Sequence, residues 1–314
     1  MSRALTFPGQ GSQAVGMGQA LAQAFETARE LFQEVDEALK QPLSRVMWQG
    51  PDADLTLTEN AQPALMAVSL AVMRVLEVDG GFQWGKHTSH VAGHSLGEYS
   101  ALAAAGAFSV ADAARLLKAR GLAMQRAVPV GIGGMAALLG AELSQAEDVS
   151  QEASQGCEIC CVANDNAPGQ VVISGHKAAL ERAAEIAKTK GIKRTIMLPV
   201  SAPFHSPMMA PAAREMEDAF DRVSIRPPRV PVISNVSVKP ESDPAVIRRL
   251  LVEQITARVR WRETVESFKA LGITSIAEIG AGKVLMTMAK RIDKDLPGVS
   301  IESPQDIEAF LKSI

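Results

Sequence analysis

A serine stands between two glycines in the pentapeptide Gly-His-Ser-Leu-Gly at residues 93–97, where an apolar strand gives way to a helix. This pattern is typical of a nucleophile elbow, because the tight turn strains the serine backbone and only glycines tolerate the crowding on either side. The Ser95 hydroxyl would point out of the fold, and the amide of Leu96 would favour negative charge beside it. The pattern indicates acyl chemistry at Ser95. The pentapeptide alone is also compatible with a chance match, so its context has to decide.

Arg120 is a second candidate, because its position on a predicted helix aims it at the interior. The helix begins at Ser109, and Asp112 completes a capping box. One stripe of the helix is apolar and comprises Ala113, Leu116, Leu117, Ala123 and Met124. At about 100° per residue, Arg120 falls in the middle of that stripe. Burying an unpartnered guanidinium costs several kcal/mol, so we expect a carboxylate beside it, which is either structural or part of a substrate.

An acyl-transfer serine needs a base, and the chain has five histidines. We favour His205, which precedes the helix start at Ser206-Pro207 and could face the elbow. His94 sits in the elbow itself, where its side chain should diverge from that of Ser95. No acidic third member is evident, so a backbone or amide carbonyl could orient the imidazole and leave the triad a dyad.

Several other motifs have simpler explanations. Gln254 follows Leu250 and Leu251 on a predicted helix, so its amide should face inward, as a core glutamine satisfied by backbone groups would. The glycines of residues 280–283 fit neither the P-loop nor the dinucleotide fingerprint, which favours tight strand-to-helix packing. The basic run at residues 188–194 could meet phosphates or an acidic protein, or could be a solvated helix end.

The cysteines crowd into one segment as Cys157, Cys160 and Cys161. A zinc site needs four good ligands, and only His176 is near in sequence. Cys157, Ile159 and Cys161 alternate like one face of a strand, so we expect buried reduced thiols and no metal.

Composition limits the classes of function. The 314 residues allow two domains, or one large α/β domain with an insertion, and 47% of them are apolar. A net charge of -3 gives no general attraction to nucleic acid or anionic membranes. The first ten residues lack an export pattern, which fits a cytoplasmic enzyme. The longest apolar run, residues 63–73, is too short to span a bilayer and is expected to form a buried helix.

The chain shows two patterns of strands and helices, and the second pattern interrupts the first. Residues 1–127 and 201–314 alternate strand and helix signals, which predicts a large α/β domain with a mainly parallel sheet and helices on both faces. One helix is expected to carry an apolar stripe from Leu21 to Leu39. Residues 128–200 read β-α-β-β-α-β, which predicts an inserted small domain of the ferredoxin-like kind.

Four segments together resemble the malonyl-CoA:acyl carrier protein transacylase family. They are residues 7–13 (FPGQGSQ), 93–100 (GHSLGEYS), 169–175 (GQVVISG) and 203–206 (PFHS). They lie in the order found in the family, and the match spans nearly the whole chain. The resemblance implies a hydrolase-like large domain and a ferredoxin-like small domain, in agreement with the element pattern.

The resemblance also implies roles for residues that match the family motifs. Ser95 would be the acylated nucleophile and His205 its general base, and the backbone amides of Gln10 and Leu96 would form the oxyanion hole. Arg120 would bind the malonyl carboxylate. This carboxylate would be the partner that the buried guanidinium needs.

Three further residues take roles by the same resemblance. Gln254 corresponds to the residue whose main-chain carbonyl orients the histidine, although Arg258 replaces the usual proline that follows it. Phe204 would crowd an α-methyl branch, a steric choice worth only about 1–3 kcal/mol, so we expect incomplete selectivity over methylmalonyl. Asn164 lies in a segment like the one at the family's interdomain cleft.

The implied reaction is a ping-pong transfer of malonyl from malonyl-CoA, through a malonyl-serine, to the phosphopantetheine thiol of acyl carrier protein for fatty acid synthesis. We expect no cofactor, no nucleic acid or membrane partner, and a monomer. The alternatives are an acyltransferase of a polyketide synthase or malonate-decarboxylase pathway, a serine thioesterase or esterase, and a non-catalytic docking subunit. The intact Ser95 and His205 argue against the last.

Overall fold

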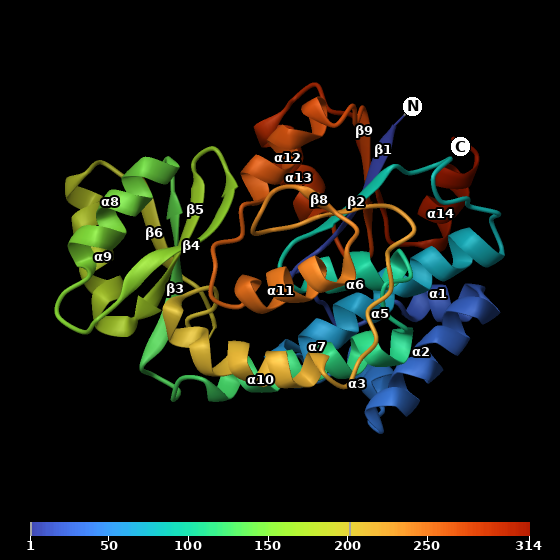
Figure 1. Cartoon of the computed structure of the whole chain (residues 1–314), viewed down its shortest axis with the longest axis horizontal. Helices are drawn as coiled ribbons and strands as arrows, with labels where there is room; N and C mark the ends of the chain where they lie inside the picture. Colours follow the sequence, from blue (N-terminus) through green and yellow to red (C-terminus); the bar gives the residue numbers. More distant parts are fainter. Residues whose placement is uncertain (1, 201) are drawn as a thin grey trace.

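A six-stranded sheet forms the centre of the larger part of the molecule (Figure 1). The computed structural model describes residues 2–200 and 202–314. The strand order is β10-β9-β1-β2-β7-β8, and every pair is parallel except β7 with β8. The strands are β1 Arg3–Phe7, β2 His90–Gly93, β7 Val232–Ile233, β8 Pro240–Glu241, β9 Ser275–Ile279 and β10 Gly298–Ile301. The predicted mainly parallel sheet is confirmed.

Helices cover both faces of this sheet, because side chains of successive strand residues point to opposite sides. Leu5 and Val91 belong to the largest apolar core, whereas Ala4 and Ala92 belong to a separate core built with α12 and α13. The helices of this part are α1 Gln19–Ala24, α2 Glu26–Leu39, α3 Leu43–Gln49, α4 Asp52–Thr56, α5 Thr58–Val78, α6 Leu96–Ala104, α7 Val110–Arg126, α10 Ala210–Phe220, α11 Pro244–Gln254, α12 Trp261–Ala270, α13 Val284–Ile292 and α14 Pro304–Leu311, with a 3-10 turn η1 at Pro207–Met209.

The α5 helix is the central helix of the largest core. By length and composition it could cross a membrane, but 83% of its most apolar window is buried inside the protein, as in a core helix. It extends well beyond the predicted residues 63–73 at both ends. Gly280 approaches α5 so closely that an added Cβ would lie 2.3 Å from the Ser69 hydroxyl oxygen. This close approach is the strand-to-helix packing expected for residues 280–283.

A second, antiparallel sheet has the order β4-β5-β3-β6. Its strands are β3 Gly133–Leu139, β4 Cys160–Ala167, β5 Gln170–His176 and β6 Arg194–Met197, and its helices are α8 Leu143–Ala153 and α9 Lys177–Thr189. The sequence of elements is the predicted β-α-β-β-α-β, with its own apolar core. The domain limits at residues 128 and 200 stay a prediction.

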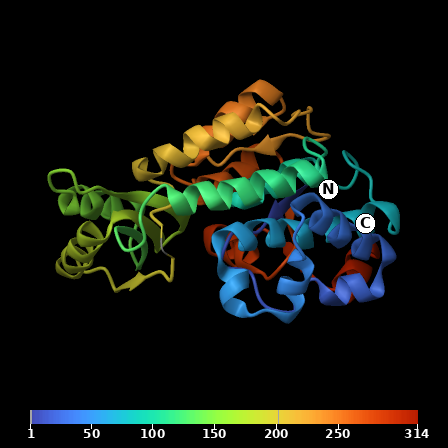
Figure 2. The same cartoon turned by 90° about the horizontal axis from the view of Figure 1, so that it is seen from below.

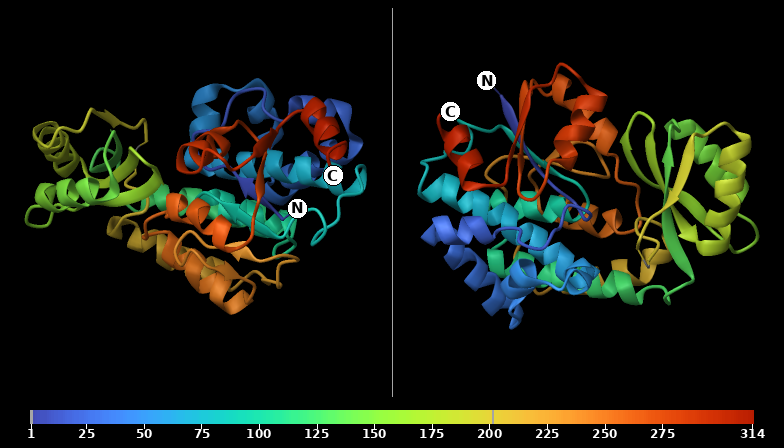
Figure 3. Two further views of the ribbon diagram at one scale, coloured as in Figure 1. Left: turned by 90° about the horizontal axis from the view of Figure 1, so that it is seen from above. Right: turned by 180° about the vertical axis from the view of Figure 1, so that it is seen from behind.

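The small sheet lies at one end of the molecule, and both termini lie toward the other end (Figures 1 and 3). The long helix α7 runs from the helices of the large part toward the small sheet (Figure 2). The chain enters the small sheet after α7 and leaves it before η1. The chain thus connects the two parts after α7 and before η1, and the parts pack against each other where α12 and α13 contact β4.

Two local predictions were wrong. The helix expected from Leu21 to Leu39 is two helices, because Phe25 between them is extended with φ of -127° and ψ of 126°. The strand expected to include Cys157 begins only at Cys160, and Cys157 is exposed. Its thiol is free but not buried, because its segment forms a turn before the strand starts.

Two further motifs remain, the basic run at residues 188–194 and the cysteine segment. Lys188 pairs with Glu185, and Lys190 pairs with Glu152, as at a solvated helix end. Cys160 is buried and free. Within the part of the chain that the structure describes, no group of three or more His, Cys, Asp or Glu side chains could hold a metal ion.

Candidate active site

Ser95 stands at the sharp turn between β2 and α6 with φ of 53° and ψ of -109°. A non-glycine residue in such a conformation costs about 1–3 kcal/mol. The turn requires both flanking glycines. A Cβ on Gly93 would lie 1.9 Å from the carbonyl oxygen of Gly97, and a Cβ on Gly97 would lie 2.2 Å from that of Phe7. The pattern of two glycines around Ser95 therefore has a steric cause.

Asn235, which follows β7, holds the strained turn in place. Its Oδ1 accepts a hydrogen bond from the Ser95 N–H at 2.8 Å, and its Nδ2 donates to the carbonyl oxygen of Gly93 at 2.7 Å. Asn235 is fully buried. Its place in the site was not identified from the sequence. A usable signal exists, because Asn235 ends a strand of a parallel sheet, and the carboxyl ends of such strands meet at one edge.

His205 lies beside the serine. Its Nε2 is 2.8 Å from Ser95 Oγ, and its Nδ1 is 2.9 Å from the main-chain oxygen of Gln254. A carbonyl oxygen can only accept, so Nδ1 carries the proton and Nε2 has the free lone pair. Ser95, His205 and the Gln254 carbonyl thus form a dyad with a carbonyl in the place of the acidic member.

The imidazole of His205 is held in its neutral form. Burial lowers its pKa to about 3, and the positive charge of Arg120 acts in the same direction. The hydrogen bond to the Gln254 carbonyl opposes both effects. A neutral imidazole with a free Nε2 is the state that a general base requires. His94 points elsewhere, because its Nε2 lies 2.8 Å from Oδ1 of Asn166.

Arg120 is 1% exposed and reaches the serine from α7. One terminal nitrogen donates to Ser95 Oγ at 3.0 Å and to Gln254 Oε1 at 3.0 Å, and the other donates to Gln62 Oε1 at 2.9 Å. The guanidinium also lies 5.4 Å from the centre of the Tyr99 ring. Its predicted burial is confirmed.

Of the two alternatives for the carboxylate partner of Arg120, the structural one is not found among the described residues. Among residues 2–200 and 202–314, its hydrogen-bond acceptors are two amide oxygens and a hydroxyl, and it forms no ion pair. Gln62 of α5 was not identified from the sequence, although a polar residue inside a buried helix is a signal for it. The remaining alternative from the sequence is a carboxylate that arrives with a substrate.

A cavity of about 330 Å³ opens in front of Ser95. Gln10, Leu96, Asn164 and Phe204 all line it, as do Arg120 and His205. The other lining residues include Gly9, Gly11, Gln62, Met135, Val172, Leu198, Val200, Val284 and Met288. Gln254 lies behind Arg120 and His205 and is fully buried. The structure therefore brings all the sequence-predicted site residues together, seven around the cavity and Gln254 behind it.

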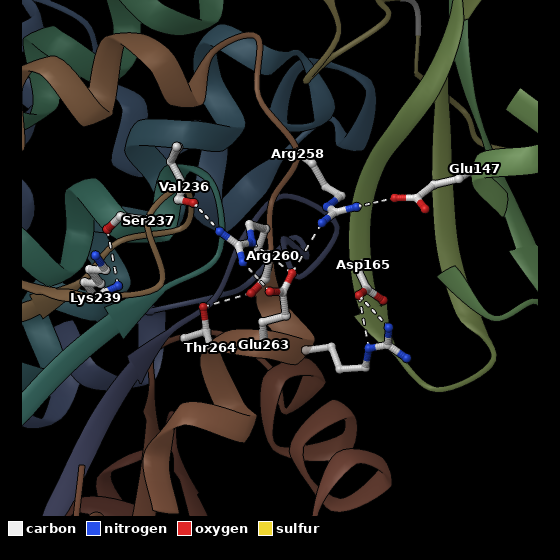
Figure 4. Close-up of polar contacts among 10 residues, drawn as sticks. Glu147, Asp165, Val236, Ser237, Lys239, Arg258, Arg260, Glu263 and Thr264 are labelled. Carbon is white, nitrogen blue, oxygen red and sulfur yellow. Dashed lines mark hydrogen bonds and ion pairs between the residues drawn. The ribbon is translucent and has the colours of Figure 1, made fainter. Parts of the chain in front are cut away.

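The cavity lies between the large part and β4, and a seam of hydrogen bonds joins the two beside it. Val259 donates its N–H to the Ala163 carbonyl at 2.8 Å and accepts from the Asp165 N–H at 3.0 Å. Arg258 forms ion pairs with Glu147 of α8 at 2.9 Å and with Glu263 of α12 at 3.3 Å (Figure 4). The arginine in the place of the usual proline is thus part of this seam.

Two neighbouring arginines also pair with carboxylates, Arg262 across the seam and Arg260 beside it. Arg262 pairs with the buried Asp165 of β4 at 3.0 Å and with Glu142 at 3.1 Å. Arg260 pairs with Glu263 and donates to the Val236 carbonyl at 2.9 Å (Figure 4). Each seam arginine therefore has a carboxylate partner, unlike Arg120.

Comparisons with known proteins agree with this geometry. A family profile described as "Acyl transferase domain" matches residues 5–300. The malonyl CoA-acyl carrier protein transacylase of Bacillus subtilis is 42% identical over 311 residues, which are 99% of this chain and 96% of that protein. The crystal structure of acyl-carrier-protein-S-malonyltransferase from Bartonella henselae is 54% identical with a TM-score of 0.97, and the match covers 100% of this chain and 99% of that one.

A second similar structure contains a partner protein. It is described as a holo type II PKS acyl-carrier protein in complex with its malonyl-transacylase. It is 40% identical with a TM-score of 0.96, and the match covers 100% of both chains. These similarities extend over the whole chain.

Proposed function

The chain belongs to the acyl transferase family, and on that premise we propose that it moves a malonyl group from malonyl-CoA to the phosphopantetheine thiol of acyl carrier protein. The protein is an acyltransferase whose relatives are malonyltransferases. The single observation that carries the choice of acyl group is Arg120. Its buried guanidinium has no carboxylate partner among the described residues and lies 3.0 Å from Ser95 Oγ.

In the first half-reaction, Ser95 Oγ attacks the thioester carbonyl while its proton passes to His205 Nε2. The backbone amides of Gln10 and Leu96 stabilise the oxyanion, each by about 2.7–4 kcal/mol of barrier. The C–S bond then breaks, and the CoA sulfur leaves with the proton from His205. The product is malonyl-Ser95.

The second half-reaction reverses these steps with a different thiol. The phosphopantetheine thiol gives its proton to His205 as its sulfur attacks the ester carbonyl of malonyl-Ser95. The ester C–O bond breaks, and His205 returns the proton to Ser95 Oγ. The Gln254 carbonyl keeps His205 Nδ1 protonated throughout, since it can only accept.

Arg120 provides the specificity in this scheme. The malonyl carboxylate binds its guanidinium and displaces the contact with Ser95 Oγ, which frees the hydroxyl for attack. Phe204 lines the same cavity and limits the space for an α-methyl branch. Asn164 offers an amide at the cavity wall next to β4.

We further propose that the enzyme works as a cytoplasmic monomer without a cofactor, since CoA thioester, serine and histidine supply every group the reaction needs. Fatty acid synthesis is the proposed use of the malonyl group. Transfer to a polyketide carrier is the second candidate, because a similar structure holds a type II PKS carrier protein. Malonate breakdown would use the same transfer chemistry.

Intact-mass analysis tests the proposal. The purified protein is mixed with malonyl-CoA, then with holo acyl carrier protein, and Ser95→Ala serves as the control. We expect a malonyl adduct on the native protein and none on Ser95→Ala, followed by transfer of the adduct to the carrier protein. Absence of the adduct would reject the proposal, and prompt hydrolysis in place of transfer would indicate a serine thioesterase.

A further inference from the structure

Glu98 is a buried acidic residue that the proposed mechanism does not use. It lies in the first turn of α6 and forms with Ser95 the Ser-x-x-Glu spacing of a capping box. In that box the glutamate would accept from the serine N–H, but here this N–H is bonded to Asn235. The Glu98 side chain turns inward and is almost fully buried.

The carboxylate of Glu98 contacts Gln254, which in turn contacts both Arg120 and His205. Its Oε2 accepts from Gln254 Nε2 at 2.7 Å and from the Asn235 N–H at 3.2 Å. Gln254 Nε2 also donates to the carbonyl oxygen of Ser95 at 3.0 Å. The opposite end of the same amide, Oε1, accepts from Arg120 at 3.0 Å.

These contacts fix which way the Gln254 amide points. An ionised carboxylate only accepts, and so does the Ser95 carbonyl, so both require the NH2 end of the amide. A flipped amide would set its NH2 against the Arg120 guanidinium and its oxygen against Glu98. Glu98 therefore presents the amide oxygen of Gln254 to Arg120.

The same arrangement places the negative charge of Glu98 one amide away from the positive charge of Arg120. The two side chains attract each other without forming an ion pair. A carboxylate in direct contact would occupy the guanidinium and compete with an acidic substrate. A carboxylate separated from the guanidinium by one amide stabilises the buried cation, and it leaves the N–H groups of Arg120 able to exchange their present acceptors for a substrate carboxylate.

We propose that Glu98 is a positioning residue that acts through the Gln254 amide to keep Arg120 oriented and open to the carboxylate of the acyl group. This inference rests on the proposed function, because it assigns a role in acyl-group specificity. It predicts that losing the charge of Glu98 impairs transfer of acyl groups that end in a carboxylate far more than transfer of acetyl.

The test compares kcat/KM for malonyl-CoA and acetyl-CoA in the native protein and in Glu98→Gln. Burial raises the pKa of Glu98 to about 7, so assays at about pH 8 keep it ionised. We expect the malonyl value to fall by roughly tenfold or more, since hydrogen bonds to charged groups are lost, while the acetyl value falls much less. The matched control is Ser100→Ala on the same helix, whose buried hydroxyl has no partner in the described residues, and it should keep the native ratio.

A second single variant and a double variant test whether Glu98 acts on Arg120 through the Gln254 amide. Gln254→Leu removes the linking amide but keeps the main-chain carbonyl that binds His205, so it should produce the same selective loss even if Glu98→Gln does not fold. In an Arg120→Ala background, Glu98→Gln should no longer change the malonyl-to-acetyl ratio. Independent effects of the two substitutions on that ratio would overturn the inference.

The outcomes separate the inference from the proposed function. If the native protein takes no malonyl group, both are rejected. If the native protein transfers malonyl and Glu98→Gln lowers malonyl and acetyl transfer equally, the proposed function stands and Glu98 is only structural.

Discussion

Arg120, beside Ser95, and the arginines of the seam with β4 differ in the groups that they contact. Arg120 is buried and contacts amide oxygens and a hydroxyl. Arg258 and Arg262 are only partly buried, and each pairs with two carboxylates. A buried cation is costly without a counter-charge, whereas a paired cation near solvent costs little. This difference agrees with the proposed role of Arg120 in binding an acidic acyl group, whereas the seam arginines already have carboxylate partners.

The largest expected effect comes from Arg120→Ala. Removing the partner of a desolvated carboxylate costs about 3–5 kcal/mol, so malonyl transfer should fall by roughly 10²–10⁴-fold while acetyl transfer falls far less. Steady-state kcat/KM with both thioesters measures the ratio. Equal losses for the two substrates would make Arg120 structural and remove the contrast with the seam.

Arg262→Gln tests an arginine of the seam that already has carboxylate partners. It leaves the buried Asp165 without its cation, so the free energy of unfolding at neutral pH should fall by about 3 kcal/mol. Burial already raises the pKa of Asp165, so the loss should shrink as pH falls and this carboxyl becomes protonated in the folded state. Urea unfolding at two pH values measures both effects. The malonyl-to-acetyl ratio should stay at its native value, and a changed ratio would show that the seam shares in specificity.

Burial and, next to it, the charge of Arg120 lower the pKa of His205, so its titration is sensitive to Arg120. With a folded pKa of about 3 against 6.5 unfolded, His205 should stay neutral from pH 5 to 8, protonated at Nδ1 only. In the window between these two values the unfolded state binds the proton, so this residue makes the protein less stable as pH falls. Nitrogen NMR of the imidazole, assigned with His205→Ala, checks this. Arg120→Ala should raise the pKa of His205, whereas Arg262→Gln should leave it unchanged.

Arg258→Ala should have the smallest effect. Its ion pair with Glu147 is near the surface, and exposed pairs contribute about 0–1 kcal/mol. Thermal unfolding should therefore shift little, and less at high salt, with acyl specificity unchanged. A loss of unfolding free energy as large as that of Arg262→Gln would mean that this replacement of proline is essential to the seam.

Much of the site could be predicted from local sequence. The glycines around Ser95 are needed because the backbone passes within 2.2 Å of where their Cβ atoms would lie, and such a constraint leaves a readable motif. The inward position of Arg120 follows from helical periodicity alone. The order of strands and helices predicted both sheets, since the alternation of elements reflects how each sheet is covered.

The errors and omissions have physical reasons as well. The extended Phe25 splits a helix whose apolar stripe continues across the break, so periodicity gave no sign of it. Asn235 contacts the site from the segment after β7, and Gln62 contacts it from α5, far from Ser95 and Arg120 in the chain. A single polar residue at the end of a strand or inside a helix does not indicate which residue it will meet.

The sequence by itself determined the strained serine, the buried arginine and the α/β order of the elements, because each depends on near neighbours along the chain. Only the tertiary structure decided that Arg120 meets two amides and a hydroxyl, with no carboxylate among the described residues, and that Gln254 links Glu98, Arg120 and His205. Such contacts join residues from separate helices and strands. Their partners are chosen by how the sheet and its helices pack, and no local pattern records that choice.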